Sequence, residues 1–312
     1  MSAFPTTPIA RYDIRYRTTI QYDDVVRGSH NELRACPASD EHQTVLAYEV
    51  AVHPQARVLS HPDYWGTRVD AFGVREPHVA LEIVADASVE VTARPRVTAS
   101  PRMSELRHPA FVEAHAELLA PSPHVAWGED VQRVADRVVS TIGDDVVGTV
   151  LALHRFVHTS LQYTPGATYI GVAVDQVLGE GRGVCQDYAH LAVALCRAAG
   201  IPARYVSGYF FAAPDATDLD ASVSEVDVQT HAWFEAAVPG WGWWALDPTN
   251  GHHVDHRHIK IGHGRDYDDV PPIRGVYAGS GRPATDAHVG IRRSAASTSG
   301  PAPFAAQAQQ QQ

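Results

Sequence analysis

The sequence predicts an α+β protein, in which an N-terminal antiparallel β-sandwich precedes a domain that packs helices on an antiparallel sheet. Three observations carry this prediction. Apolar and polar residues alternate through residues 12–93, as they do in half-buried strands. Residues 129–161 then repeat apolar positions with the period of helices, and two aromatic-rich strands flank a turn near residue 239.

The first part of the chain is expected to be β-structure. The stretches YDIRYRTTIQY (12–22), TVLAYEVAVHP (44–54) and HVALEIVADASVEVTA (78–93) show the period of two. The residues expected to line a buried face include Val79, Leu81 and Ile83. Because this part contains no catalytic set of residues, we predict an accessory domain that shapes or shields the neighbouring core. An independent β-domain is the alternative.

The pattern divides the chain into four segments. We predict a β-rich N-terminal domain at 1–105, a proline-containing linker at 106–125, a second domain at 126–291 and a disordered low-complexity tail at 292–312. The second domain is expected to begin with helices near 129–141 and 144–161. A strand at 203–211 and an exposed acidic loop at 213–227 are expected after its central helix.

Composition narrows the class of protein. The net charge is −11 over 312 residues, which argues against nucleic acid or an anionic membrane as the main partner. No apolar run approaches the roughly 20 residues that span a bilayer, and no signal peptide is evident at the N-terminus. We therefore expect a cytoplasmic protein. The three cysteines do not form a disulfide framework, and Cys196 is expected to be a small core residue.

A cysteine stands where a helix is expected to begin. Cys185 follows the GRG sequence at 181–183, and the apolar residues 189–199 predict a helix buried almost all round. Gly200 ends this helix. The free N–H groups and the positive dipole end at its start favour a thiolate and could hold an oxyanion. A buried structural thiol is the alternative, and the residues downstream weigh against it.

A hairpin supplies two partners for such a thiol. In THAWFEAAVPGWGWWALDPTN (230–250), a turn centred near residue 239 places His231 opposite Asp247, give or take one residue. Opposed residues share a sheet face with Cβ atoms about 4.5–5.5 Å apart. A carboxylate there can fix one imidazole nitrogen, so that the other takes a proton from a thiol. An ordinary polar pair at a sheet end is the alternative.

Three motifs in this order resemble the bacterial transglutaminase-like superfamily. They are GRGVCQDYAHLAVALCRAAGIPARYVSGYF, THAWFEAAVPGWGWWALDPTNG and GRDYDDVPPIRGVYAG, and the likeness spans about 129–281. The alternating strands before them resemble the N-terminal region of bacterial members. The resemblance implies a papain-like core with Cys185 as nucleophile, His231 as base and Asp247 as orienting acid.

Relatives often carry an aromatic or amide side chain before the cysteine to assist the oxyanion. Tyr169 and Gln176 are the candidates here, and the sequence does not choose between them. Gln186 and Asp187 follow the nucleophile and are further candidates for substrate contact. Asp187 is also favoured in a first helical turn by the dipole alone.

A histidine-rich stretch follows the hairpin. Its rings are His252, His253, His256, His258 and His263. Such a cluster can bind zinc or nickel, but no paired cysteines accompany it and strand alternation would scatter the rings over both faces. We therefore predict a polar strand and loop, no metal site and no cofactor.

The predicted function is thiol-dependent acyl transfer on an amide or peptide, as in a cysteine peptidase or amidase. A protein-glutamine gamma-glutamyltransferase, in which an amine resolves the thioester, is the first alternative. A peptide-binding module with an idle triad is the second, and the presence of all three residues argues against it. The expected partner is a protein or peptide substrate, whose identity the sequence does not reveal.

Overall fold

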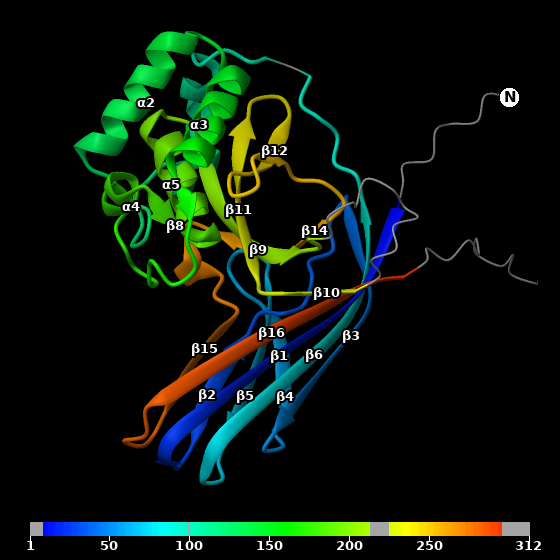
Figure 1. Ribbon diagram of the computed structural model, residues 1–312. Coiled ribbons are helices and arrows are strands. Elements are labelled where there is room, and N and C mark those ends of the chain that lie inside the picture. The colour runs from blue at the N-terminus through cyan, green and yellow to red at the C-terminus, as the bar shows by residue number, and fades with distance from the viewer. Residues whose placement is uncertain (1–8, 99, 213–224, 295–312) are drawn as a thin grey trace, which may run out of the picture.

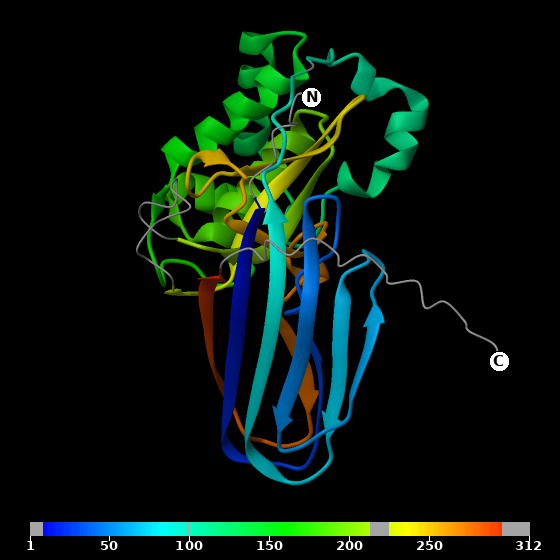
Figure 2. The same ribbon diagram turned by 90° about the vertical axis from the view of Figure 1, so that its right-hand side faces the viewer.

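Two antiparallel sheets form the predicted sandwich in the computed structural model, which describes residues 9–98, 100–212 and 225–294. The first sheet has the order β10 (Glu225–Val228), β16 (Pro283–Ser294), β1 (Ile9–Val26), β6 (His78–Thr92) and β3 (Gln43–His53). The second has the order β15 (Ile273–Tyr277), β2 (Ser29–Leu33), β5 (Arg68–Val74) and β4 (Val58–Pro62). Figure 2 shows the sandwich as a long lobe below the helices.

The alternating residues of β1 and β6 face the interior, as predicted. Tyr12, Ile14, Leu81 and Ile83 are buried between the sheets. Val79 is an exception, because its side chain is 51% exposed although it shares a face with Leu81. The pairing of β1 with β6 shifts register between Gln21 and Val26, opposite Val79, so the regular sheet has not yet begun there.

The last two strands return to the sandwich, which corrects the domain boundary predicted at residue 291. β16 pairs with β1 from Arg11 opposite Ser294 to Tyr22 opposite Pro283, and β15 pairs with β2. Figure 1 shows β16 beside β1, although the two strands come from opposite ends of the chain. The predicted boundary therefore falls inside β16. The sequence could not show this, because pairing between such distant segments leaves no local signal. The predicted disorder concerns mostly residues 295–312, which lie outside the described residues.

The predicted linker is structured. Residues 105–118 form η1 (Glu105–Arg107), α1 (Pro109–Ala114) and η2 (Ala116–Leu118). Leu106 and Val125 are buried in the core of the second domain, which holds this stretch in place. The prolines that suggested a linker therefore lie in a segment that packs against the core. Most of the predicted acidic loop, 213–224, lies outside the described residues, and 225–228 form β10.

The second domain packs helices on a five-stranded antiparallel sheet, confirming the predicted fold class. Its helices are α2 (Glu129–Ile142), α3 (Val146–Ser160), α4 (Val174–Glu180) and α5 (Cys185–Ala198). The sheet has the order β13 (His252–His253), β12 (Gly242–Asp247), β11 (His231–Val238), β9 (Ala203–Phe210) and β14 (His258–Gly264). A short parallel pair, β7 (Gln162–Tyr163) and β8 (Arg182–Gly183), leads into α5. Figure 1 shows the helices gathered on one side of β11 and β9.

The central helix α5 is buried, as its apolar sequence predicts, and the two strongly polar side chains of its 189–199 stretch have hydrogen-bond partners there. The Arg197 guanidinium donates to the carbonyl oxygens of Ala203 at 2.9 Å, Ala120 at 2.9 Å and Arg265 at 2.7 Å. His190 accepts from the backbone N–H of Tyr267 at 3.2 Å, and burial lowers the pKa of His190 to about 3. α5 is thereby tied to the linker and to the loop after β14.

The second domain contributes side chains to the hydrophobic core of the sandwich. Tyr209, Phe211, Ile259 and Ile261 of the second domain are buried among the residues of β1 and β6. The Tyr209 hydroxyl donates to the carbonyl of Ala35 at 2.8 Å, and the Gln43 side chain bonds both backbone groups of Lys260. These contacts between the domains favour the hypothesis of an accessory N-terminal domain over that of an independent β-domain.

A chain truncated to begin at Pro123 is expected to lose solubility. It would expose the four shared side chains, and each Ile or Phe removed from a core costs about 1.5–3 kcal/mol. It would also leave β16 without β1. Dye binding to exposed apolar surface and size-exclusion chromatography measure the effect, with a chain beginning at Ile9 as control. A soluble truncated monomer that keeps Cys185-dependent activity would instead support an independent β-domain.

A buried ion cluster lies on the face of the sheet opposite the helices. Glu235 of β11, 1% exposed, pairs with Arg204 of β9 at 2.6 Å and with Lys260 of β14 at 2.8 Å. Arg204 also stacks on the Trp243 ring, 3.9 Å from its centroid. Burial alone would raise the pKa of Glu235, but the two cations hold it well below its ordinary value.

Replacing Glu235 with glutamine is expected to lower the free energy of unfolding by roughly 3–5 kcal/mol, because two buried cations lose their counter-charge. The matched control is Asp86→Asn, which breaks an exposed pair with Arg15 and should cost about 0–1 kcal/mol. Urea unfolding followed by circular dichroism measures both. Since the folded pKa of Glu235 is depressed, the wild-type contribution is present above about pH 4.5 and is lost as the pH falls further. Equal losses in both variants would contradict this assignment.

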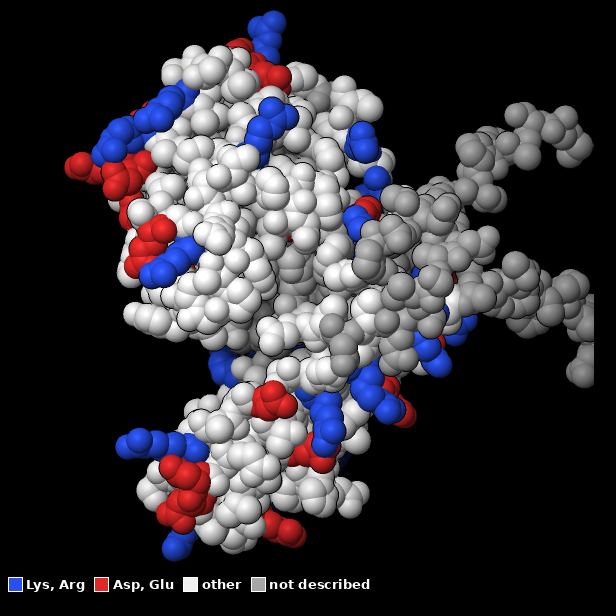
Figure 3. Space-filling view, viewed as in Figure 1, with Lys and Arg blue, Asp and Glu red and all other residues white. Residues whose placement is uncertain are grey.

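Charged side chains are interspersed over the surface rather than segregated. On the face shown in Figure 3, acidic and basic groups alternate on both lobes, and the region between the lobes is largely uncharged. Among the described residues, no helix combines the length and apolarity needed to cross a membrane.

Candidate active site

The start of α5 holds Cys185 in place. The Asp187 carboxylate accepts from the backbone N–H of Val184 at 2.8 Å and from the Thr168 hydroxyl at 2.5 Å, which fixes the first turn and the loop before it. Gly183 must be glycine, because an added Cβ would lie 2.8 Å from the Cβ of Asp187. Cys185 is the first residue of the helix and is half-buried. Asp187, a predicted substrate contact, thus caps the helix that presents the thiol.

His231 and Asp247 share a sheet face, as predicted, but their register differs from the prediction. Leu246 lies opposite Phe234, so Asp247 comes beside Trp233, two residues from the predicted partner. A shift of two residues keeps every side chain on its face. The Nε2 atom of His231 therefore still reaches Oδ2 of Asp247, at 2.8 Å.

Asp247 is a fully buried carboxylate with every lone-pair direction used. Its Oδ1 atom accepts from the backbone N–H groups of Thr249 at 2.9 Å and Asn250 at 3.1 Å. Its Oδ2 atom accepts hydrogen bonds from Nε2 of His231, from the Asn250 amide at 2.7 Å and from Nε2 of His258 at 3.1 Å. Burial alone would raise the pKa of Asp247, but the charge and hydrogen bond of His231, with the bond from His258, hold it well below its ordinary value.

The ring of His231 joins the carboxylate to the thiol. Burial alone would lower the pKa of His231, but the charge and hydrogen bond of Asp247, with smaller contributions from Cys185, raise it to about 10. Cys185 is therefore close enough to His231 to influence its pKa. Because Asp247 occupies Nε2, Nδ1 is the nitrogen left for the thiol. At neutral pH the ring is therefore an imidazolium poised between a carboxylate and a sulfur.

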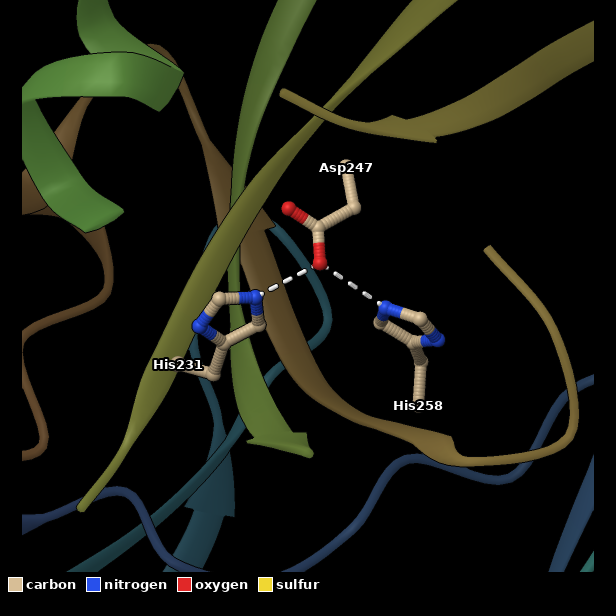
Figure 4. Close-up of side chains that lie close together, drawn as sticks. All are labelled: His231, Asp247 and His258. Atoms are coloured by element: carbon tan, nitrogen blue, oxygen red, sulfur yellow. Dashed lines mark hydrogen bonds and ion pairs between the residues drawn. The ribbon is translucent and has the colours of Figure 1, made fainter. Parts of the chain in front are cut away.

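His258 is a functional candidate that sequence reasoning missed as a partner of Asp247. Figure 4 shows the His231 and His258 rings converging on the same carboxylate oxygen from two sides. His258 lies eleven residues beyond Asp247, on β14 at the far edge of the sheet from β12. The histidine-rich stretch was the only signal for it, and that stretch was predicted to be a polar strand and loop rather than a partner of Asp247.

Helix α3 supports the turn that carries Asp247. Nε2 of His154 bonds the carbonyl oxygen of Asp247 at 2.9 Å, and Nδ1 of His158 bonds that of Pro248 at 3.1 Å. Burial lowers the pKa of His154, which keeps its ring neutral as a donor to that carbonyl. No pattern in the sequence distinguished these two histidines from others on an amphipathic helix.

Three further residues were predicted to contact the substrate or the oxyanion: Gln186, Tyr169 and Gln176. Gln186 follows Cys185 and is half-buried, whereas Tyr169 is 74% exposed. Gln176 lies on an exposed face of α4 and donates to Glu180 at 2.8 Å. The oxyanion roles of Tyr169 and Gln176 stay predictions. Tyr163, at the end of β7, is an aromatic residue that the sequence analysis did not consider; burial, and then the charge of Cys185, raise its pKa.

Two groups of three side chains have ligand atoms within 4.8 Å of one another among the described residues. One is His231, Asp247 and His258, whose facing atoms already hydrogen bond to each other. The other is His124, Asp266 and Asp268. Of the histidine-rich stretch, only His258 belongs to either group within the described chain. The stretch forms β13, a loop and β14, matching the predicted polar strand and loop.

The papain-like core, the sandwich and the thiol–imidazole–carboxylate chain define a class of protein. Residues 132–248 match the transglutaminase-like superfamily, and residues 12–90 match the bacterial transglutaminase-like N-terminal region. The chain belongs to the transglutaminase-like superfamily.

Individual relatives cover nearly the whole chain. An uncharacterized protein of Mycobacterium leprae is 34% identical over 91% of this chain and 99% of its own. One of Mycobacterium tuberculosis H37Rv is 31% identical over 93% of this chain and 95% of its own. A protein-glutamine gamma-glutamyltransferase of Pseudomonas aeruginosa is 37% identical over 31% of this chain but 14% of its own. Among solved structures, a candidate cysteine protease from Cytophaga hutchinsonii has the same fold, with a TM-score of 0.72, 22% identity and coverage of 94% and 93%.

Proposed function

We propose that the protein is a thiol-dependent enzyme that cleaves an amide bond of a protein or peptide, with Cys185 as nucleophile, His231 as acid and base, and Asp247 as orienting group. The observation that carries this proposal is the 2.8 Å hydrogen bond between His231 and Asp247, with Cys185 close enough to raise the pKa of His231. A raised imidazole pKa, a buried carboxylate and a thiol at a helix start are the elements of an activated sulfur nucleophile.

The proposed reaction has two halves. The Cys185 sulfur adds to the carbonyl carbon, the N–H groups at the start of α5 bind the oxyanion, and His231 gives the Nδ1 proton to the leaving amine as the C–N bond breaks. A thioester remains on Cys185. Water then adds to this thioester while His231 takes its proton, the C–S bond breaks, and a carboxylic acid leaves. The proton on His231 restores the starting ion pair.

The triad serves hydrolysis and amine transfer equally, because the two differ only in the nucleophile that resolves the thioester. We favour hydrolysis, since a site open to water is the simpler requirement. The second candidate is transfer to a lysine amine. It is favoured by the match to the Pseudomonas aeruginosa gamma-glutamyltransferase, a match that covers 14% of that protein. A cytoplasmic location and the expected lack of nucleic-acid and membrane partners stay predictions.

Peptide libraries incubated with the purified full chain test the proposal. Released amine or new carboxyl termini, without added amine, indicate hydrolysis; incorporation of an added primary amine into glutamine peptides indicates transfer. Cys185→Ala is the control in both assays. Peptide binding without turnover in the wild type, unchanged in Cys185→Ala, would point to the idle binding module instead.

A further inference from the structure

A second histidine contacts the carboxylate of the triad. His258 is fully buried, and its Nε2 atom lies 3.1 Å from Oδ2 of Asp247, the oxygen that also accepts from His231. A carboxylate on a β-strand end can rotate about its side-chain bonds, and only some rotamers aim Oδ2 at His231. A donor fixed on the other side of Oδ2 restricts that rotation.

The far side of the His258 ring is fixed as well. Its Nδ1 atom lies 3.2 Å from the backbone nitrogen of Asp255 and 3.2 Å from Oδ1 of the same residue. Nε2 faces the Asp247 carboxylate, which can only accept, so Nε2 carries a proton there. Asp255 is itself held by Arg257 at 2.7 Å. The titratable and charged groups around His258 are Asp247, Asp255, His231, His252, His256 and Arg257.

Aromatic contacts set the plane of the ring. The His258 centroid lies 4.6 Å from that of Phe210 on the neighbouring strand β9 and 5.4 Å from that of Trp233 on β11, the next strand of the sheet. Aromatic packing and hydrogen bonds at both nitrogens fix the position of the His258 ring. The fixed ring therefore restricts rotation of the Asp247 carboxylate.

We propose that His258 is a positioning residue that keeps the Asp247 carboxylate in the orientation in which it pairs with His231. His258 does not touch the reacting atoms, and it acts through Asp247. Outer partners of metal-ligating histidines contribute about 10–100-fold to metal affinity or activity, and we expect an effect of similar size here. The inference rests on the proposed function of the triad and goes beyond it by adding a fourth residue.

The reactivity of Cys185 toward iodoacetamide at pH 6 tests this without a known substrate. At that pH an unassisted thiol is mostly protonated and reacts slowly. His258→Phe keeps an aromatic ring among Phe210 and Trp233 but removes the donor, and we expect its alkylation rate to fall roughly tenfold. His258→Gln keeps a donor at the same distance along the side chain and should retain most of the rate. His252→Phe, on a ring 5.4 Å from His258, is the matched control and should change nothing.

A double-mutant cycle separates positioning from a general structural role. If His258 acts through Asp247, then His258→Phe should have no further effect in an Asp247→Asn background. Additive losses, a wild-type rate in His258→Phe, or loss of the folded state in that variant by circular dichroism would each overturn the proposal. His231→Ala tests the triad separately: a wild-type rate in this variant would overturn the proposed function, whatever His258 does.

Discussion

Replacing Cys185 with alanine is expected to abolish amide cleavage. No other sulfur atom can form the proposed thioester, because Cys36 and Cys196 are both buried. Removing the nucleophile of a comparable serine triad costs about 10⁶-fold in turnover. Turnover of the best library peptide measures the loss, with protein concentration set by absorbance. The alanine variant should keep the wild-type melting temperature, since Cys185 is half-buried at a helix end.

Labelling of the wild type provides the matching control. Burial raises the pKa of Cys196 to about 12, and burial likewise raises that of Cys36 to about 11, so both stay protonated and shielded at neutral pH. Iodoacetamide should therefore modify Cys185 far faster than Cys36 or Cys196, as peptide mass spectrometry would show. The variant Cys196→Ala should keep its activity. Equal labelling of all three thiols, or turnover by Cys185→Ala, would contradict the role of Cys185.

Replacing Asp247 with asparagine is expected to lower turnover by about 10⁴-fold, the loss seen in the best-studied serine triad. The asparagine amide can turn its NH₂ toward His231, which favours the wrong imidazole tautomer for taking a proton from sulfur. It also removes the charge that, against burial, raises the pKa of His231 to about 10. Steady-state kinetics on the same peptide measure the loss.

The pH profile distinguishes this effect from simple unfolding. Because Asp247 raises the pKa of His231, the imidazolium of the variant should lose its proton at lower pH, and the alkaline limb of kcat/KM should move toward neutrality. Asp136→Asn, on the exposed face of α2, is the control and should leave rate and profile unchanged. An Asp247→Asn variant with the wild-type profile would show that Asp247 does not act on His231.

Local patterns of the sequence placed Cys185 at the start of a helix and His231 beside Asp247, as the structure has them. The start of α5 could be read from the glycines before Cys185, the apolar run after it and the stop at Gly200, all within one short segment. The shared face of His231 and Asp247 survived a register error of two residues, because side chains in a strand alternate with a period of two. Only an odd shift would have separated them.

The partners that support the triad could not be read in the same way. His258 reaches Asp247 because β14 pairs with β9, and the α3 histidines reach the same turn because α3 packs on the sheet. Asp187 was recognised as a favoured first-turn residue, but its bond to Thr168 depends on how the preceding loop folds back. A histidine in a polar stretch has the same sequence signature whether or not it meets a carboxylate.

The sequence by itself determined the β-rich region, the α-rich region and the central helix, since each depends on neighbours a few positions away. It also predicted Cys185, His231 and Asp247 as the triad. Only the tertiary structure decided that β15 and β16 complete the N-terminal sandwich, that the second domain contributes side chains to the core of this sandwich, and that His258 joins Asp247. Periodicity and capping are local properties of the chain. Strand order and the contacts between distant segments follow from burying all apolar faces at once, which no single segment specifies.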